Sequence, residues 1–583
     1  MRINFKIIFL VFTGFILYGT ILLWIRCGAN LRSNSLERKS DIYSISQKLK
    51  VEGDQNSDPP SNSGTLNLFK TEEIDCNING DYTIRCRKEA EEVYIPFSFI
   101  HKYFEVYGKL TRYNGADRFE WSHSYARVHQ PKRKYTTEGV FTYFENYKVE
   151  ERDRVKCISG MEGVPVTTQW KPAGYFYPTQ IAQFGLAHYS KNLTEPKPRR
   201  SVIAHSHSVD KSWIIPEGSL LTSIITNDSN TIRSTVLKFS TVGDEGVTLN
   251  AKFNSDFVLS VDLKLNVDAS SCLQVTLMDL EKKEFWFLNY ICGNFFIKAK
   301  KPHIYHGIKC NEWTSLVRDL FIDLQKGLVA LKIPKKQIFR SKLRISNLKF
   351  FGSGLCSSIF LSTNEHSKQF FAAAEWLVTN QNNLTGGWAN PVQRKLAPGF
   401  RTLEPGWYSA MGQGHAISLL ARAYYVSKNS KYLKAAFLGL KPFHALTNNG
   451  GVVTHFMDQL PWFEEYPTTP SSFTLNGFIY SLIGLYDLVS VAPVDKKEEA
   501  SLLLNEGLDS LKKMLLFYDT GSGSMYDLRH LTLHVAPNLA RWDYHATHVN
   551  QLLLLHTIFH DPIFLTVGTR WQDYMKGTRA QHN

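Results

Sequence analysis

The spacing of apolar residues changes once along this chain, near residue 365, and this change limits the folds that the chain can adopt. From about residue 92 to residue 360, apolar and polar residues alternate in several segments, and turn residues separate them. Beyond residue 365 the apolar residues follow the period of a helix, and loops rich in glycine and proline come between. The sequence therefore predicts a multidomain α+β protein, in which a β-barrel or β-sandwich domain is followed by a helical domain.

Seven amphipathic helices are predicted in the C-terminal part, at residues 367–379, 409–427, 433–446, 473–488, 498–516, 543–556 and 562–575. Helices joined by loops in this way are expected to pair as antiparallel hairpins, and we predict an incomplete (α/α) barrel. The turns at residues 386–388 and 404–407 fall between helices, where the mouth of such a barrel would expose them.

The N-terminus carries an uncharged, mostly apolar run at residues 7–25, close to the roughly 20 residues that cross a bilayer as a helix. We expect a retained signal anchor there, after a cytoplasmic tail of residues 1–6. A cleaved signal peptide is the alternative, although its apolar region usually has only about 7–15 residues. Residues 33–70 are rich in Ser, Asn, Lys and Asp, so a flexible stem is predicted over residues 26–75.

The net charge of +14 predicts an anionic partner, and on charge alone nucleic acid, anionic lipid and acidic glycan all remain open. Three N-x-S/T sequons, at Asn192, Asn227 and Asn383, are compatible with a secretory compartment. Cys76 and Cys86 bracket an Asn-Gly turn signal and could form a small disulfide loop. Most of the other cysteines are expected to be buried thiols in strands.

Three tyrosine-centred blocks lie near the C-terminus: Glu-Glu-Tyr-Pro at 464–467, Tyr-Asp-Leu-Arg-His at 526–530 and Arg-Trp-Asp-Tyr-His at 541–545. Each places a proton-transfer group beside a cation or a carboxylate. Removal of the weakly acidic hydrogen next to a carboxylate requires a base on one face, a cation or donors at the carboxylate, and a proton donor on the other face. The blocks therefore predict proton transfer at a sugar acid within an acidic polysaccharide. The alternative is that each tyrosine is an ordinary core residue with a satisfied hydroxyl.

The spacing within the first two blocks predicts individual roles. Tyr526 and Arg529 are three residues apart, which places them on one side if that turn is helical, with Arg529 as a clamp for a carboxylate. Glu465, beside Tyr466, is a candidate base. A neighbouring cation would lower the pKa of a tyrosine, which is normally near 10.

The third block predicts one polar helix face, formed by Arg541, Tyr544, His545 and His548. This polar character is difficult to explain as core. The two histidines are not favoured as a metal pair, because no third ligand accompanies them at a recognised spacing.

Aromatic residues are also mixed with amides and arginines upstream, in residues 147–154, 168–170 and 175–180. A sugar-binding site needs flat faces for stacking and donors for hydroxyl and sulfate groups. These segments therefore predict part of a substrate-binding cleft, although an ordinary aromatic-rich β core would have the same composition. The basic loops at 132–134, 197–200, 298–301 and 335–336 are expected to be solvated, and some could extend a track for a polyanion.

Five longer runs resemble the D-glucuronyl C5-epimerases of heparan sulfate and heparin biosynthesis. They begin at residues 152, 175, 403, 464 and 538 and read RDRVKCISG, YFYP, LEPGWYSAM, EEYPTTPSSF and NLARWDYH. The likeness covers roughly residues 90–583 and weakens in residues 195–360. It implies conversion of D-glucuronic acid to L-iduronic acid within N-sulfated heparosan, without a nicotinamide, and the chain has no dinucleotide-binding fingerprint.

The resemblance also implies a cellular context and a domain plan. We expect a single-pass type II protein of the Golgi membrane with a luminal catalytic part, acting as a homodimer and not binding nucleic acid. Association with heparan sulfate sulfotransferases is left open. The implied domains are a β-hairpin region at residues 76–155, a β-barrel at 156–360 and a C-terminal (α/α) catalytic domain at 361–583.

By match of motif, the resemblance implies that Glu465 and Tyr544 are the acid/base groups on opposite sides of the sugar ring. Tyr526 would assist, and Arg529 would hold the carboxylate. The further residues implied to contact the substrate are Tyr147, Arg152, Asp153, Arg154, Gln169, Tyr177, Gln180, Lys395, Tyr466, Asn476, Tyr480, Asn538, Arg541, Trp542 and His545.

No cofactor is expected to be required for the chemistry. Some members of the family carry a calcium ion in the β domain, but Phe-Gly-Ser-Gly at 351–354 stands where an aspartate is expected, so its ligands cannot be placed. Two other functions remain open. A polysaccharide lyase would share the proton abstraction and then expel the C4 oxygen, and a non-catalytic scaffold would bind the glycan and dock sulfotransferases.

Overall fold

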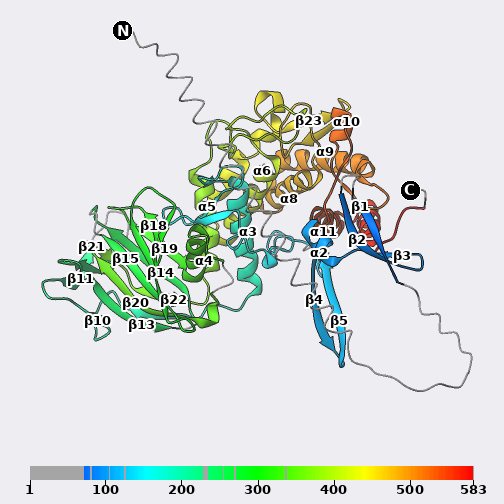
Figure 1. The fold of residues 1–583 in the computed structure, drawn as a ribbon. Helices are drawn as coiled ribbons and strands as arrows, with labels where there is room; N and C mark the ends of the chain where they lie inside the picture. The colour runs from blue at the N-terminus through cyan, green and yellow to red at the C-terminus, as the bar shows by residue number, and fades with distance from the viewer. Residues whose placement is uncertain are drawn as a thin grey trace, which may run out of the picture. The chain divides into compact units, whose positions relative to one another are not determined.

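The computed structural model of the chain describes residues 71–78, 82–103, 106–123, 126–226, 234–253, 255–267, 271–334 and 338–581 (Figure 1). The predicted tail, anchor and nearly all of the stem lie outside these residues, as do the Asn79-Gly80 turn signal and the sequon at Asn227. Among the helices that the structure does describe, none is long and apolar enough to cross a membrane.

The chain divides into two compact units, one ending at Phe99 and the other beginning at Ile100. The first holds an antiparallel sheet of β1 (Glu72–Ile78), β2 (Tyr82–Glu89) and β3 (Glu92–Tyr94). Cys76 in β1 is bonded to Cys86 in β2, with 5.9 Å between the Cα atoms, as the sequence predicts.

An antiparallel hairpin of β4 (Val106–Tyr113) and β5 (Ala116–His123) lies near the start of the second unit. Its turn consists of Asn114 and Gly115, with φ angles of +50° and +83°. A two-residue turn of type I′ needs positive φ at both positions, which Asn-Gly adopts with little strain.

Two seven-stranded sheets share one apolar core and form a β-sandwich (Figure 1). One sheet has the order β10 (Trp213–Ile214), β13 (Val247–Phe253), β20 (Leu343–Phe351), β15 (Cys272–Asp279), β16 (Glu284–Cys292), β18 (His303–Ile308), β17 (Ile297–Lys300). The other has the order β11 (Leu220–Thr226), β12 (Ser234–Ser240), β21 (Ser353–Cys356), β14 (Val258–Leu265), β22 (Ile359–Ser362), β9 (Arg200–Ala204), and β19 (Thr314–Asp319) also pairs with β14. In the described strands the pairing order of neither sheet closes on itself, so of the two predicted forms the structure has the sandwich rather than the barrel.

A second disulfide, between Cys292 and Cys310, corrects the expectation of buried thiols at those positions. Strands β16 and β18 run parallel and pair Cys292 with Ile308, which brings Cys310 beside Cys292. The remaining described cysteines are thiols: Cys157 and Cys356 are buried, and Cys272 is half-buried.

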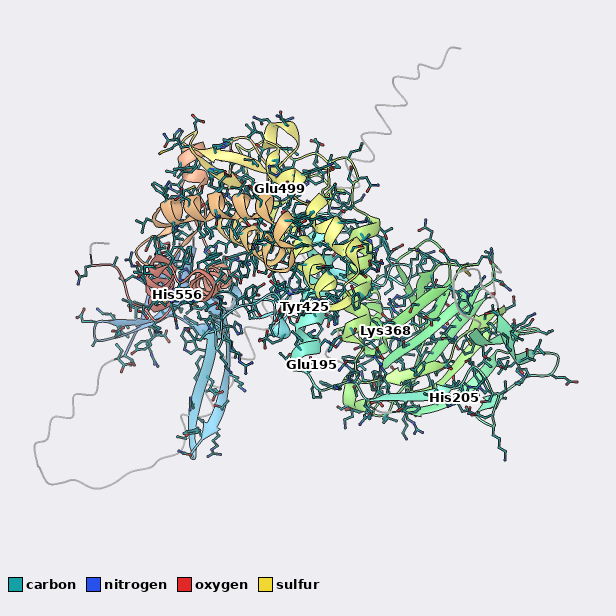
Figure 2. All side chains as sticks on the ribbon, turned by 180° about the vertical axis from the view of Figure 1, so that it is seen from behind. Glu195, His205, Lys368, Tyr425, Glu499 and His556 are labelled. Atoms are coloured by element: carbon teal, nitrogen blue, oxygen red, sulfur yellow. A yellow bond between two sulfur atoms is a disulfide. The ribbon has the colours of Figure 1, made fainter. Side chains whose placement is uncertain are left out.

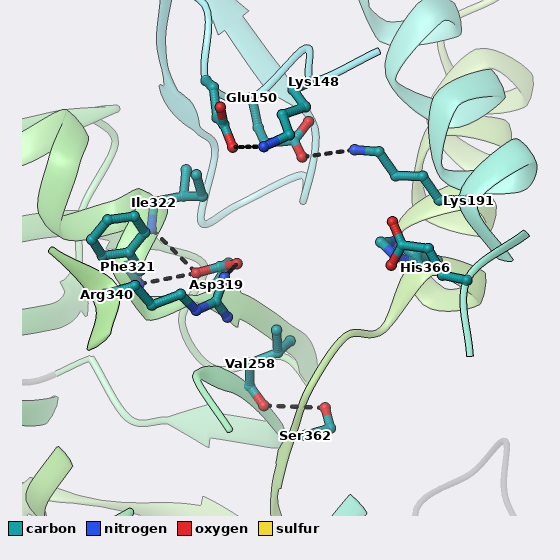
Figure 3. Close-up of polar contacts among 12 residues, drawn as sticks. Lys148, Glu150, Lys191, Val258, Asp319, Phe321, Ile322, Arg340, Ser362 and His366 are labelled. Carbon is teal, nitrogen blue, oxygen red and sulfur yellow. Dashed lines mark hydrogen bonds and ion pairs between the residues drawn. The ribbon is translucent and has the colours of Figure 1, made fainter. Parts of the chain in front are cut away.

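A helix that the sequence analysis does not predict, α4 (Leu320–Ala330), follows β19 directly. Asp319 caps it, because its carboxylate accepts hydrogen bonds from the backbone N–H groups of Phe321 and Ile322 at 3.0 and 3.2 Å (Figure 3). The capped helix packs against β16 and β17.

The end of β19 and α4 together hold the segment that contains three predicted site residues, 152–154. Lys326 on α4 donates from Nζ to the carbonyl of Arg152 at 2.8 Å. Arg318 on β19 donates from Nη2 to the carbonyl of Ile158 at 2.9 Å. The sandwich therefore fixes both ends of residues 152–158.

Eight of the described helices form two rows. In the first, α3 (Pro178–Thr194), α6 (Ala410–Ser427), α8 (Leu475–Val491) and α11 (Trp542–Phe559) contact one another in that order. In the second, α5 (His366–Thr379), α7 (Ser430–Leu438), α9 (Glu498–Met514) and α12 (Pro562–Tyr574) each pack on one helix of the first row, also in that order. Paired rows are the arrangement expected of an incomplete (α/α) barrel.

The first-row helix α3 falls in a region that the sequence analysis assigns to strands. Nearly every residue from Pro178 to Lys191 is buried, so no polar face reveals the helical period. Apolar residues between positions 135 and 189 accordingly belong to the same core as the C-terminal helices. The predicted domain limits at residues 155 and 360 stay predictions. The helix predicted at 433–446 is also different, since α7 ends at Leu438, before Gly439 and Pro442.

Two polar contacts connect the sandwich to α5. Arg200 of β9 donates from Nε and Nη2 to the Glu365 carboxylate, both at 2.7 Å, just before α5 begins. Lys368, labelled on α5 in Figure 2, donates from Nζ to the Ser260 hydroxyl of β14. A buried carboxylate paired with a guanidinium in this way fixes the start of the helix.

Candidate active site

Glu465 lies between β24 (Leu460–Phe463) and α8, and its side chain is only 6% exposed. Asn476 on α8 donates from Nδ2 to Oε2 of Glu465 at 3.4 Å, and Tyr466 provides a second side-chain hydrogen bond. Burial nevertheless raises the pKa of Glu465 to about 7, and the nearby charge of Asp527 adds to the increase. A carboxyl with this pKa can both accept and release a proton near neutral pH.

Gly477 allows the Glu465 side chain to pack directly on α8. A Cβ at position 477 would lie 2.4 Å from Oε2 and 2.6 Å from Cβ of Glu465, so the carboxyl and its stem would both have to move. Glycine is therefore needed here for close approach rather than for backbone freedom.

We predict that Gly477→Ala lowers kcat by about a hundredfold, because displacement of a catalytic group by about 1 Å has effects of this size. The change is also expected to destabilise the fold by about 1–3 kcal/mol through overpacking. The matched control is Gly568→Ala on α12, where a Cβ would come no closer than 3.3 Å to Leu552 or Leu553. Thermal melting checks that both variants are folded. Equal kcat in the two folded variants would show that activity does not depend on the close packing of Glu465 against Gly477.

Tyr466, Tyr526 and Tyr544 gather around Glu465, and we call these four residues the tyrosine–glutamate cluster. The rings of Tyr526 and Tyr544 are 4.8 Å apart and meet edge to face, and Tyr466 also hydrogen-bonds to Tyr526. Burial raises the pKa of each of these tyrosines, and the charge of Glu465 raises it further. A cation was expected to lower these values; Arg154 and Arg541 do oppose the rise at Tyr544, but burial is the larger effect.

Tyr526 is not helical as the spacing argument supposed, but lies in the short strand β25 (Met525–Asp527). Arg529 begins α10 (Arg529–Leu533). Its Nε donates to Oδ1 of Asp527 at 2.8 Å and its Nη2 donates to Oδ2. Asp527 is fully buried and also accepts from Nδ2 of Asn538 at 2.8 Å. One edge of the guanidinium is thus occupied, and none of the described contacts of Arg529 involves Nη1.

Arg154 extends the cluster from the segment held by the sandwich. Its Nη1 donates to Oε1 of Gln169 at 3.1 Å. Its positive charge acts on both Tyr177 and Tyr544, against the burial that raises the pKa of Tyr177 to about 12. The structure thus brings Arg154, Gln169 and Tyr177 to the same site as Tyr544.

Several predicted contact residues have other surroundings. His545 is 1% exposed, and its ring nitrogens are satisfied by the Ser524 hydroxyl at 2.7 Å and the Trp571 carbonyl at 2.8 Å. Tyr480 is buried against His415, 4.5 Å between ring centroids, and hydrogen-bonds to Tyr143. Each of these two side chains has structural contacts within the protein, and the predicted contact with substrate stays a prediction.

The other predicted residues lie nearer the surface. Arg152 is stacked on Tyr147 at 3.9 Å from the ring centre. Arg541 is 62% exposed and pairs with Asp543. Lys395 and Asp153 are exposed, and Trp542 is half-buried at the start of α11. These side chains are not part of the tyrosine–glutamate cluster. Their predicted contact with a long substrate stays a prediction.

Several buried polar atoms at or beside predicted contact positions have no partner. Within the described residues, both amide atoms of Gln180, the hydroxyl of Tyr175, Oδ1 of Asn476 and Nε of Arg394 form no hydrogen bond. Buried polar groups are normally satisfied, so these atoms are available to a polar ligand, although similar atoms also occur in the sandwich, for example in Trp286 and His306.

Three residues that the sequence analysis did not single out contribute to this site. Asp527 orients Arg529, and its position inside the Tyr-Asp-Leu-Arg block was the available signal. Trp407 lies 6.0 Å from Tyr466, in a turn that was expected at a barrel mouth. Glu464 accepts from the Ser472 hydroxyl and the Phe473 N–H, both at 2.9 Å, and burial raises its pKa to about 8.

The calcium ion implied by the resemblance does not fit the described residues near 351–354. Ser353 lies there with Ser271 and Asn266, which supply hydroxyl and amide oxygens but no carboxylate. Calcium sites normally use carboxylates among six to eight oxygen ligands. No group of three acidic, histidine or cysteine residues suited to a metal occurs in the described part of the chain.

Two family models, both describing parts of D-glucuronyl C5-epimerases, match different regions of the chain. The family model described as "D-glucuronyl C5-epimerase C-terminus" matches residues 381–573, and that described as "D-glucuronyl C5-epimerase, beta-sandwich domain" matches residues 233–353. The chain is also similar to an uncharacterized protein of Methanocaldococcus jannaschii, with 29% identity over 177 residues, which cover 29% of this chain and 53% of that protein.

Among solved structures, a polysaccharide lyase matches with a TM-score of 0.25 and 14% identity, over 36% of this chain and 54% of its own, and this likeness is too low to support an argument. The D-glucuronyl C5-epimerase of Caenorhabditis elegans is 37% identical over 562 residues, which cover 88% of this chain and 90% of that protein. With both family models, this extent of identity shows that the chain belongs to the D-glucuronyl C5-epimerase family.

Proposed function

We propose that the protein converts D-glucuronic acid to L-iduronic acid within N-sulfated heparosan, by removing the hydrogen at C5 and returning one to the opposite face. The observation that carries this proposal is the Glu465 carboxyl, whose pKa burial raises to about 7 beside three phenols. Membership of the family supports the same reaction class.

Glu465 is the base in this proposal, and Tyr544 is the proton donor. The C5–H bond breaks, its proton passes to the Glu465 carboxylate, and its electron pair spreads into the sugar carboxylate as an enolate. A new C5–H bond then forms with the phenolic proton of Tyr544 on the other face. The raised pKa of Tyr544 supports this assignment, because the phenol is protonated at neutral pH and can donate.

Glu465 must then lose this proton, and the Tyr544 phenolate must regain one. Tyr466 hydrogen-bonds to both Glu465 and Tyr526, and the Tyr526 ring contacts the Tyr544 ring at 4.8 Å. The hydrogen bonds of Tyr466 support proton transfer from Glu465 as far as Tyr526. Exchange with solvent then restores the Glu465 carboxylate and the Tyr544 phenol, and this exchange brings solvent deuterium to C5.

The enolate intermediate needs positive charge at the sugar carboxylate. Arg529 can supply it through Nη1, since Asp527 holds the Nε and Nη2 edge and fixes the orientation of the guanidinium. Arg154, held by Gln169, is the second cation near Tyr544. The clamp is thus proposed as two guanidinium groups rather than one bidentate arginine.

The cellular proposals are those of a luminal Golgi enzyme, anchored as a type II membrane protein, that forms a homodimer and associates with sulfotransferases. Two disulfides support an oxidising compartment. Asn192 and Asn383 are both exposed and so are accessible to glycosylation. A loss of mobility shift after Asn383→Gln, on secretory expression and glycosidase treatment, would test this context.

The reaction is tested by incubating the protein with N-sulfated heparosan in deuterated water and analysing the uronic acids by NMR. Deuterium at C5 together with iduronate in uncut chains is expected. Chain cleavage with an unsaturated product would mean a lyase instead, and binding without C5 exchange would mean a scaffold; either result would overturn the proposal.

A further inference from the structure

Arg394 is a guanidinium near the candidate active site that has no acidic partner among the described residues. It lies half-buried in the loop between α5 and α6, and its backbone is fixed by hydrogen bonds to and from Leu403 at 2.9 and 2.8 Å. The guanidinium carbon lies 4.9 Å from the centre of the Trp170 ring. Nε is buried without a hydrogen-bond partner among the described residues, and none of the described ion pairs includes Arg394.

Trp170 connects this arginine to the tyrosine–glutamate cluster. Its ring centre lies 5.5 Å from that of Tyr177 and 6.2 Å from that of Trp407, which in turn lies 6.0 Å from that of Tyr466. Trp170 also has a φ of +70°, a backbone conformation that is rare for a bulky side chain and is retained mainly at functional sites. Successive ring contacts therefore connect Arg394 to Tyr466, which hydrogen-bonds to Glu465.

The surroundings of Arg394 favour an anionic ligand. A partly buried cation with an unsatisfied N–H is costly unless a partner arrives. Arg529 has such a partner already, because Asp527 occupies its Nε and Nη2 edge, whereas Arg394 is held in place by a ring stack that leaves its donors unused. A planar guanidinium held in one orientation is suited to a group with several oxygens, such as sulfate or carboxylate.

Arg394 is connected to the tyrosine–glutamate cluster through other side chains. Its guanidinium contacts Trp170, whose ring lies near those of Tyr177 and Trp407, and the Trp407 ring lies near that of Tyr466. Its charge acts on Tyr175, where with Arg154 it opposes the burial that raises the pKa. A ligand at Arg394 is therefore expected on a sugar that flanks the reacting one.

We infer that Arg394, stacked on Trp170, is a specificity-determining residue that binds an anionic group on a sugar flanking the reacting uronate, either the sulfate of the adjacent glucosamine or the carboxylate of the next uronate along the chain. This inference rests on the proposed function. It predicts that loss of the guanidinium weakens substrate binding and leaves the proton-transfer step intact, since Arg394 touches neither Glu465 nor Tyr544.

The test compares wild type with Arg394→Gln and Arg394→Lys on three chains: N-sulfated, N-acetylated, and N-sulfated with the flanking uronates reduced to alcohols. The glutamine variant is expected to raise KM on the N-sulfated chain about ten- to a hundredfold with kcat changed less than about threefold, and lysine to give an intermediate value. The matched control is Arg340→Gln, which removes an arginine stacked on Phe257 and Phe321 in the sandwich.

The three chains distinguish the source of the anion. If the group is the sulfate, wild type and Arg394→Gln bind the N-acetylated chain equally; if it is the carboxylate, they bind the reduced chain equally. Equal binding of the unmodified N-sulfated chain by wild type and Arg394→Gln, with both folded, would overturn the inference. Equilibrium binding is measured as well as turnover, so an absence of C5 exchange in wild type would count against the proposed function alone.

Discussion

Replacement of Glu465 by glutamine is expected to lower kcat by about 10²- to 10⁴-fold, the range associated with loss of a general acid–base group. Glutamine has nearly the same size and can still accept a hydrogen bond from Asn476, but it cannot take up the C5 proton. Because burial raises the pKa of Glu465 to about 7, wild type holds comparable amounts of carboxylate and acid near neutral pH. The variant is therefore expected to fold and to bind substrate while failing to exchange the C5 hydrogen.

The pH dependence of kcat/KM gives a second test of the same residue. The carboxylate is the form that accepts the proton, so wild-type kcat/KM, which reports ionisation of the free enzyme, is expected to rise with pH with a midpoint near 7, where Glu465 ionises. In Glu465→Gln the residual activity should lack this rise. The control is Glu499→Gln on α9, an exposed residue paired with His444 (Figure 2), which should keep both the rate and the profile. A persistent rise near pH 7 in Glu465→Gln would assign the base to another group.

The sequence predicts most helices beyond residue 365 but misses α3 and α4, which lie in the region assigned to strands. Helix α12 has a polar face and matches the predicted 562–575 almost residue for residue. In α3 the face is absent because nearly all of its residues are buried between α5 and α6. A short strand, β8 (Tyr175–Phe176), does form in that region just before the helix starts at Pro178. Pro at the first helical position was the available signal.

The sequence could predict the three blocks that contribute to the site, but not how their side chains contact one another. Each block combines a tyrosine with charged residues, and this is visible in the sequence. Whether Arg529 points to a substrate or to Asp527 depends on side-chain geometry, and the structure has both oxygens of Asp527 bonded to it. His545 was likewise selected for its place on a polar helix face, whereas the Ser524 hydroxyl makes it a satisfied core residue.

The direction in which the tyrosine pKa values shift could also not be predicted without the structure. A neighbouring arginine suggested a lowered pKa, but the sequence does not say how much water the hydroxyl loses on folding. At Tyr544 burial raises the pKa more than Arg154 and Arg541 lower it. This reverses the expected direction of the pKa shift and favours Tyr544 as a proton donor, because a phenol that retains its proton at neutral pH can donate it.

Replacement of Tyr544 by phenylalanine is expected to abolish epimerisation while leaving C5 exchange at glucuronate. The variant keeps the ring that contacts Tyr526 and loses only the proton on the second face. Glu465 can still remove the glucuronate hydrogen and return deuterium from solvent to the same face, so deuterium should enter D-glucuronate without L-iduronate being formed. The rate of iduronate formation is expected to fall by about 10²- to 10⁴-fold.

Hydrogen exchange at C5 of L-iduronate gives a second test of which residue serves which face of the sugar. With L-iduronate as substrate, Tyr544→Phe should show almost no C5 exchange, because the hydrogen then faces the missing hydroxyl. The matched control is Tyr574→Phe on α12, a buried tyrosine whose hydroxyl donates to Asp519 at 3.0 Å, and it should epimerise normally. If Tyr544→Phe instead exchanged iduronate and not glucuronate, Glu465 would serve the iduronate face. The two residues would then exchange the roles of base and donor in the forward reaction.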